Sequence, residues 1–193
     1  IDVTRVLHEA KSHCDFIILL VHGGKEHYPY PTPNLQKYCR FMVDQGVGAV
    51  ICQHSHCIGS YEYYSGAPIV YGQGNFVFEA TKGSKPNVLE GLLVKLILDG
   101  SNECSVQWIP VLQSVGIPGV QLMLDERREQ VLRDFKKRSS QIIDKEFVRD
   151  QWIQECRRDK YNYASLILGF SRGLRFLNKK LHFSDWLYST ESR

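Results

Sequence analysis

The chain has 193 residues, of which 43% are hydrophobic and 23% are charged, and its formal net charge is +3 at neutral pH. These values predict a globular protein with a sizeable core, and a charge so close to balance gives no argument for a nucleic-acid partner. The six cysteines lack Cys-x-x-Cys spacing, which excludes a ribbon-type zinc site and fits free thiols in a reducing compartment.

The first predicted unit is a helix, a strand, a loop and a second helix. Residues 1–11 form the first helix, and the apolar run 15–21 forms a strand that stops at His22 and two glycines. Alternating prolines make 28–33 an extended loop, which either borders a site or serves as a rigid connector. Apolar residues at helical spacing over 35–43 then predict a helix, closed at Gly46, that crosses between parallel strands.

The next strand, 49–51, leads into Cys52-Gln53-His54-Ser55-His56, so two strands direct His22, His54 and His56 at one sheet edge. Ligands of open α/β sheets lie outside the carboxyl ends of the strands, and neutral imidazole suits transition metals. A metal site is therefore the leading hypothesis, although each histidine could instead be a hydrogen-bonded structural residue. The other histidines lack this setting and are assigned no chemistry: His8, His13, His27 and His182.

Antiparallel strands are predicted for the middle of the chain. Segments 60–64 and 68–78 flank a turn at 65–67, and segments 92–98 and 105–112 flank an Asp-Gly turn at 99–102. Gly72 and Gly74 fall inside the predicted strand 68–78. They do not form a dinucleotide-binding loop, because no helix follows them.

Two or three helices are predicted from Asp125, which can cap the first, to Trp186. Their apolar face is expected to hold Leu132, Phe135, Ile142 and Ile143. The basic residues of this region could contact an anionic membrane surface or polymer, but interleaved acidic residues favour a solvated helix face. The basic residues are Arg127, Arg128, Arg133, Lys136, Lys137, Arg138, Arg172, Arg175, Lys179 and Lys180.

Three motifs in this order resemble those of the bacterial capsule and poly-γ-glutamate synthesis proteins of the CapA or PgsA type, a branch of the calcineurin-like metallophosphoesterases. Residues 22–28 are similar to the family's His-Trp-Gly-x-Glu-Tyr segment, 52–56 to Gly-His-His-Pro-His, and 69–78 to a Tyr-Ser-x-Gly-Asn-Phe strand. The chain departs from the family at Gly23, Cys52, Gln53 and Ser55, which bears on the substrate rather than on the fold.

The resemblance implies an α/β fold: the C-terminal part of a layered metallophosphoesterase-like α/β sandwich with a mixed sheet, followed by a helical tail. Residues 1–119 would be the C-terminal half of that domain, and residues 120–193 a helical C-terminal extension. The family's upstream motifs, which supply the remaining ligands and an acid, have no counterpart here. We therefore expect a fragment of a longer protein, with no catalytic residue of its own assigned.

The resemblance further implies capsule or poly-γ-glutamate biosynthesis with a metal-dependent, phosphoesterase-like hydrolase site, half of which is present. His22, His54 and His56 would hold one or two divalent ions (Mn, Zn or Fe) that polarise a phosphoryl or acyl oxygen and activate water. Glu26, Gln53 and Asn75 would bind substrate or support the ligands. As a fragment, the chain is expected to bind metal weakly and to turn over little.

The implied partners are an anionic polymer or phosphoester substrate and membrane-associated machinery for polymer synthesis, with a cytoplasmic or membrane-associated location. Two alternatives stay open. The chain could belong to a non-catalytic assembly or export factor for an anionic surface polymer, since fold does not fix function. It could also belong to a hydrolase of a γ-glutamyl polymer, which only substrate tests would distinguish.

Overall fold

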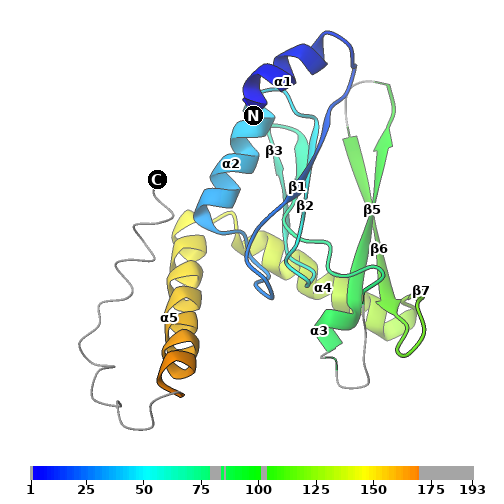
Figure 1. The fold of residues 1–193 in the computed structure, drawn as a ribbon. Helices are drawn as coiled ribbons and strands as arrows, with labels where there is room; N and C mark the ends of the chain where they lie inside the picture. Colours follow the sequence, from blue (N-terminus) through cyan, green and yellow to red (C-terminus); the bar gives the residue numbers. More distant parts are fainter. Residues whose placement is uncertain (1, 79–83, 85, 101–103, 170–193) are drawn as a thin grey trace.

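The structure is a computed structural model that describes residues 2–78, 84, 86–100 and 104–169. It contains two sheets side by side, with helices packed against them (Figure 1). The first sheet is mixed: three strands are parallel, and the fourth pairs antiparallel. Its strands, in spatial order, are β1 (Ile18–His22), β2 (Ala49–Gln53), β4 (Ala67–Val70) and β3 (Tyr61–Tyr64).

The second sheet is antiparallel and consists of β5 (Glu90–Leu98), β6 (Cys104–Gln113) and β7 (Val120–Leu122). The helices are α1 (Val3–Lys11), α2 (Pro33–Asp44), α3 (Pro86–Leu89), α4 (Asp125–Gln141) and α5 (Lys145–Gly169). An α/β fold with a mixed sheet, followed by helices, is therefore confirmed. The segment predicted to be entirely helical, 120–193, begins instead with β7, which completes the second sheet.

Helix α2 is the predicted crossover between the parallel strands β1 and β2. Thr32 caps it by accepting a hydrogen bond from the Leu35 N–H at 3.1 Å, and Gly46 follows its end with φ +87°. Pro33 was expected in the loop but opens the helix, because proline lacks only an N–H that the first turn leaves unpaired anyway. The strand predicted from residue 15 begins at Ile18.

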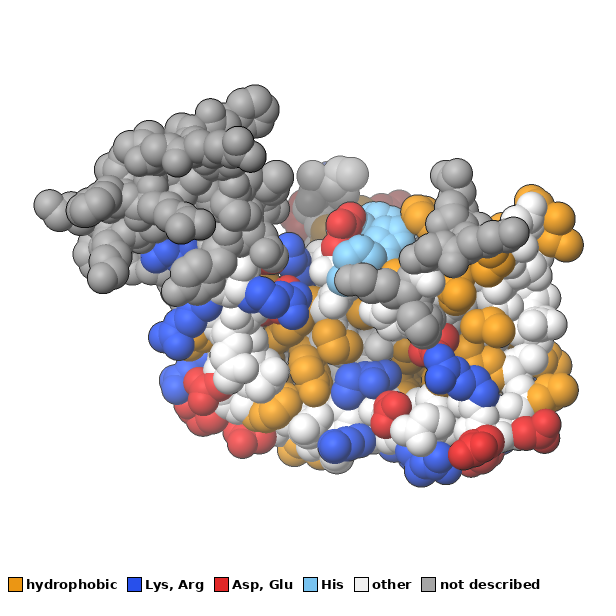
Figure 2. Space-filling model, turned by 90° about the horizontal axis from the view of Figure 1, so that it is seen from below, with side chains coloured by type: hydrophobic (Ala, Val, Ile, Leu, Met, Phe, Trp, Pro, Cys, Tyr) orange, Lys and Arg blue, Asp and Glu red, His pale blue; other side chains and the backbone are white. Residues whose placement is uncertain are grey.

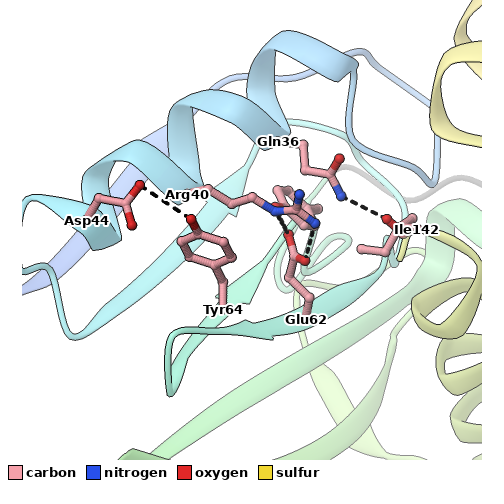
Figure 3. Close-up of polar contacts among 7 residues, drawn as sticks. Gln36, Arg40, Asp44, Glu62, Tyr64 and Ile142 are labelled. Carbon is pink, nitrogen blue, oxygen red and sulfur yellow. Dashed lines mark hydrogen bonds and ion pairs between the residues drawn. The ribbon is translucent and has the colours of Figure 1, made fainter. Parts of the chain in front are cut away.

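Polar contacts fix α2 to the elements below it (Figure 3). Arg40 donates two hydrogen bonds to Glu62 on β3, with Nε–Oε1 and Nη2–Oε2 distances of 3.0 and 2.6 Å. Gln36 Nε2 donates to the Ile142 carbonyl at 2.9 Å, just past the end of α4. These contacts join residues up to 106 positions apart, so α2 is held on both sides.

One apolar core lies between α2 and the first sheet, and the ends of α4 and α5 complete it. Ile142 and Val148 are buried in it. Its other buried members are Leu7, Cys39, Met42, Val43, Val47, Val50, Cys52, Ala67, Ile69 and Tyr71. Because α4 and α5 supply part of this core, they are packed onto the α/β body.

A second core lies between α4 and the second sheet, around Phe135, which is fully buried against Tyr61 and Trp108. The predicted apolar face of α4 is partly wrong. Ile143 is 71% exposed, whereas Ile142, which also follows the end of α4 at Gln141, is fully buried. Asp125 is also not the cap: it is the first helical residue, and the capping position, Leu124, makes no side-chain bond.

The strand predicted over 68–78 stops at Val70. Residues beyond it form single bridges, Ile58 with Gln73 and Gly74 with Gly91 on β5. Gly74 has a φ of +70°, which breaks the extended backbone, so Gly72 and Gly74 lie outside the strand where we predicted them. This irregular segment carries Asn75 towards the carboxyl ends of β1 and β2.

Other sequence predictions concern the tail and the thiols. The predicted helix up to Trp186 and the basic residues Arg172, Arg175, Lys179 and Lys180 lie outside the described residues. None of the helices within the described residues combines the length and apolarity that a membrane crossing requires. The cysteines are free thiols, and Cys39 and Cys52 bring their sulfur atoms to 3.6 Å within the first core.

Candidate metal centre

The carboxyl ends of β1 and β2 bring three imidazoles together. The parallel register pairs His22 with Gln53, so the two strands end at the same level, and His54 and His56 follow directly. The ring centroids of His22 and His54 are 5.0 Å apart, and those of His54 and His56 are 5.9 Å apart. Figure 2 shows histidine side chains gathered as one patch on the surface, with an acidic side chain against them.

The turn after β2 has an unusual backbone. His54 and His56 have φ angles of +102° and +52°, a region that non-glycine residues rarely adopt and that costs roughly 1–3 kcal/mol per residue. Buried Ser55 lies between them and donates to the Cys57 carbonyl at 2.9 Å. A Cβ at Gly72 would lie 2.5 Å from the Ser55 hydroxyl oxygen, so this close packing holds the turn in place.

Among the residues that the structure describes, Glu26, His54 and His56 form a group of candidate ligands, since one ligand atom from each lies within 4.8 Å of the others. The Glu26 carboxylate lies 4.0 Å from His54 Nε2. Two imidazoles and a carboxylate are a donor set that zinc, iron and manganese accept, so the residues fit a divalent transition metal. Glu26, which we expected to support the ligands, is inside this group, whereas His22 lies beside His54 and outside it.

Asn75 orients His56 from behind. Its Oδ1 lies 2.8 Å from His56 Nδ1, and its Nδ2 donates to the Val88 carbonyl at 2.9 Å, which fixes the direction of the amide. Because an amide oxygen can only accept, Nδ1 of the neutral ring carries the proton and Nε2 keeps its lone pair. Asn75 is only 6% exposed. This is the arrangement that holds a metal-binding histidine in one tautomer.

Gln53 is directed to a different partner. Its Nε2 donates to Gln73 Oε1 at 3.2 Å, and Gln73 Nε2 donates in turn to the Leu92 carbonyl of β5 at 3.3 Å. The two glutamines thus connect the end of β2 to the second sheet. A role of Gln53 towards substrate stays a prediction.

The sequence analysis assigned no role to two residues that lie near the site. The ring of His27 lies 6.0 Å from that of His56, and its N–H donates to the Ser55 carbonyl at 2.7 Å. The only signal was its position next to Glu26. Phe78 has its ring 4.9 Å from His56 and is 56% exposed, so it gives one side of the site an apolar rim. No spacing in the sequence marked this contact.

Comparison with known proteins finds sequence similarity over the first part of the chain. Residues 2–80 match the family model described as "Bacterial capsule synthesis protein PGA_cap". The chain is 34% identical over 74 residues to the "PGA biosynthesis protein CapA" of Bacillus subtilis (strain 168). These residues make up 38% of this chain and 20% of that protein. It is 32% identical over 69 residues to the "Capsule biosynthesis protein CapA" of Bacillus anthracis. These residues make up 36% of this chain and 17% of that protein.

The matched stretch is thus a fifth or less of these relatives' length. The stretch that the family model matches, residues 2–80, contains every residue of the candidate centre, from His22 to Asn75, together with the β1–α2–β2 unit that positions them. Residues 2–80 are therefore similar in sequence to the CapA-type family of bacterial capsule synthesis proteins.

Proposed function

We propose that this chain carries part of a divalent-metal centre in a capsule or poly-γ-glutamate biosynthesis protein, and that the centre serves a metal-dependent, metallophosphoesterase-like hydrolase. The observation that supports this is the convergence of Glu26, His54 and His56, whose ligand atoms lie within 4.8 Å of one another. They come from two different loops, so their convergence is a tertiary feature.

In this proposal the chain's own residues hold the metal ion and orient its ligands. His54 and His56 present imidazole nitrogens from a backbone turn fixed by Ser55, and Asn75 keeps His56 in the tautomer that leaves Nε2 open. His22 and His27 flank the group and offer further imidazoles to a second ion or to substrate. When bound, a divalent ion would supply Lewis-acid activation of a phosphoryl or acyl oxygen.

Charge favours an anionic substrate at this centre. A single carboxylate, Glu26, balances half of a divalent charge, and neutral imidazoles balance none. The site with its ion would therefore keep a positive charge and attract a phosphoester or a carboxylate-bearing polymer. The same incomplete balance leads us to expect modest metal affinity.

The proposal is tested by titrating the purified chain with Zn²⁺ and Mn²⁺ by calorimetry. We expect binding by the wild type and at least about tenfold weaker binding by His54→Ala, which removes one ligand. His13→Ala is the matched control, because His13 is exposed and lies in the connection between α1 and β1. A wild type that binds neither ion, or a His54→Ala variant that binds as tightly as the wild type, would contradict the proposal.

Turnover assays then separate the possible activities of the centre. Hydrolysis of an activated phosphodiester that is lost in His54→Ala would support the phosphoesterase-like reading. Release of glutamate from a γ-linked polymer would favour a γ-glutamyl hydrolase. Metal binding without either activity, in a longer chain that includes more of the sequence its relatives have, would favour a non-catalytic assembly or export role.

A further inference from the structure

Helix α5 lies outside the stretch that matches the capsule synthesis family, yet it contacts the loop that carries Glu26. Lys25 Nζ lies 2.7 Å from Asp159 Oδ2, and both side chains are mostly buried, at 29% and 21% exposed. A pair that is largely removed from solvent is screened less than a surface pair. This contact joins the residue directly before Glu26 to a helix more than 100 positions away in the sequence.

An aromatic contact follows the ion pair along the same loop and the same helix. Tyr28 is 5% exposed, and its ring packs 5.7 Å from that of Trp152. Two positions on, the Tyr30 ring packs edge-on against Phe147, with the centroids 5.3 Å apart. Helix α5 therefore contacts the loop at residues 25, 28 and 30, along one continuous line.

The loop is held on its other side by backbone hydrogen bonds to the turn after β2. The Gly23 N–H donates to the Gln53 carbonyl at 3.1 Å, and the His27 N–H donates to the Ser55 carbonyl at 2.7 Å. Glu26 lies between these two anchors, and its side chain is 54% exposed. A further contact next to Glu26 comes from α5, through the Lys25–Asp159 pair.

We propose that α5 is a positioning element of the candidate metal centre: Asp159, through Lys25, holds the loop so that the Glu26 carboxylate meets His54 and His56. Lys25 and Asp159 are positioning residues, because neither belongs to the group of ligand atoms. The inference rests on the proposed metal-binding function and assigns a role to a part of the chain that the family match does not cover.

The sign of the effect of Lys25→Met distinguishes positioning from simple electrostatics. Removing a positive charge beside a cation site should tighten metal binding if charge alone matters. If Lys25 positions Glu26, the same change should weaken Zn²⁺ binding, by about tenfold, the lower end of what supporting residues contribute. Asp159→Asn should also weaken binding. In a Glu26→Gln background, Lys25→Met should add little, because the ligand that it positions is already lost.

The measurement is calorimetric titration of the full chain with Zn²⁺, together with hydrogen exchange of the loop in the metal-free protein. We expect faster exchange at residues 25–28 in Lys25→Met and an unchanged melting temperature within a few degrees. Arg149→Met is the control, since it removes an exposed ion pair with Glu146 on the same helix. It should leave both readouts unchanged.

Three outcomes decide the inference. The inference is supported if Lys25→Met weakens Zn²⁺ binding, Arg149→Met does not, and Lys25→Met adds little further loss in the Glu26→Gln background. If the wild type binds Zn²⁺ and Lys25→Met binds it equally or more tightly, the positioning role is overturned, and the proposed function stays intact. Absence of binding by the wild type overturns the proposed function, and this inference with it.

Discussion

Asn75 Oδ1 accepts a hydrogen bond from His56 Nδ1 at 2.8 Å, and this contact connects the irregular segment after β4 to the turn after β2. The Asn75 amide is fixed because its Nδ2 donates to the Val88 carbonyl, which also accepts from Gln113 Nε2 at 2.8 Å. The orientation of His56 thus depends on the Val88 carbonyl of α3 and on buried Gln113 of β6.

Replacing Asn75 by alanine should therefore weaken metal binding more than it weakens the fold. The Val88 carbonyl keeps its bond from Gln113, so we expect a loss of about 1 kcal/mol in unfolding free energy. Zn²⁺ affinity should fall by roughly 10–100-fold, because His56 loses its fixed tautomer. Asn75→Asp retains the acceptor and should bind more tightly than the alanine variant. Calorimetry and urea denaturation measure the two effects, and equal Zn²⁺ affinities of both variants would count against the orienting role.

The Arg40–Glu62 pair is expected to matter for stability rather than for metal binding. Its side chains, drawn in Figure 3, are 19% and 8% exposed. Glu62 also accepts a hydrogen bond from the Tyr71 hydroxyl at 2.6 Å. Arg40→Met leaves the carboxylate buried without its cation and should cost about 3 kcal/mol. Adding Glu62→Leu should recover at least half of that loss.

Urea denaturation of the single and double variants checks this prediction. The exposed pair of Arg149 and Glu146 provides the comparison, since Arg149→Met should change the unfolding free energy by less than about 0.5 kcal/mol. If the double variant proves as unstable as Arg40→Met alone, the loss does not come from an uncompensated buried charge.

Cys57 should make the protein less stable in alkali. Burial raises the pKa of this thiol, 5% exposed, to about 11, whereas an unfolded cysteine has a pKa of about 8.5. The folded state thus favours the protonated thiol. Its contribution is fully present below about pH 8.5, and it is lost as the pH rises to about 11, with a total of roughly 3 kcal/mol.

The measurement is the unfolding free energy at several pH values between 8 and 11 for the wild type and Cys57→Ala. Subtracting the two curves isolates the thiol from other groups that titrate in alkali. Between pH 8 and 11, the wild type should lose up to roughly 3 kcal/mol more unfolding free energy than Cys57→Ala. Cys14→Ala is the control, because the Cys14 thiol is exposed. Parallel curves for the wild type and Cys57→Ala would refute the assignment.

Gly91 should tolerate no side chain. It lies on β5 opposite Gly74, and a Cβ there would clash with the Asn75 carbonyl oxygen. Gly91→Ala is therefore expected to cost about 2 kcal/mol and to displace the segment that holds His56. At Gly23 the nearest atom to an added Cβ is 3.9 Å away, so Gly23→Ala should be close to neutral. Thermal unfolding of both variants provides the comparison, and equal losses would contradict the close approach.

The sequence by itself determined the parallel strands, the helix between them and the edge at which the site forms. The strands ending at His22 and Gln53, the crossover helix between them and the hairpin of β3 and β4 follow from apolar periodicity and turn residues, which act locally. Parallel strands joined by a helix end at one edge, so the meeting of His22, His54 and His56 followed from connectivity alone. The motifs that resemble the family could also be recognised from the sequence, because each is short and contiguous.

Tertiary structure alone decided that a carboxylate joins the histidines at that edge. Glu26 joins His54 and His56 because the turn after β2 adopts positive φ angles, and residue type gives little indication of these outside glycine. The end of β4 at Val70, the exposure of Ile143 and the contact of Asp159 with Lys25 depend on packing between distant segments. Local patterns record which face of an element is apolar, whereas the partner of that face is set by the free energy of the whole packed chain.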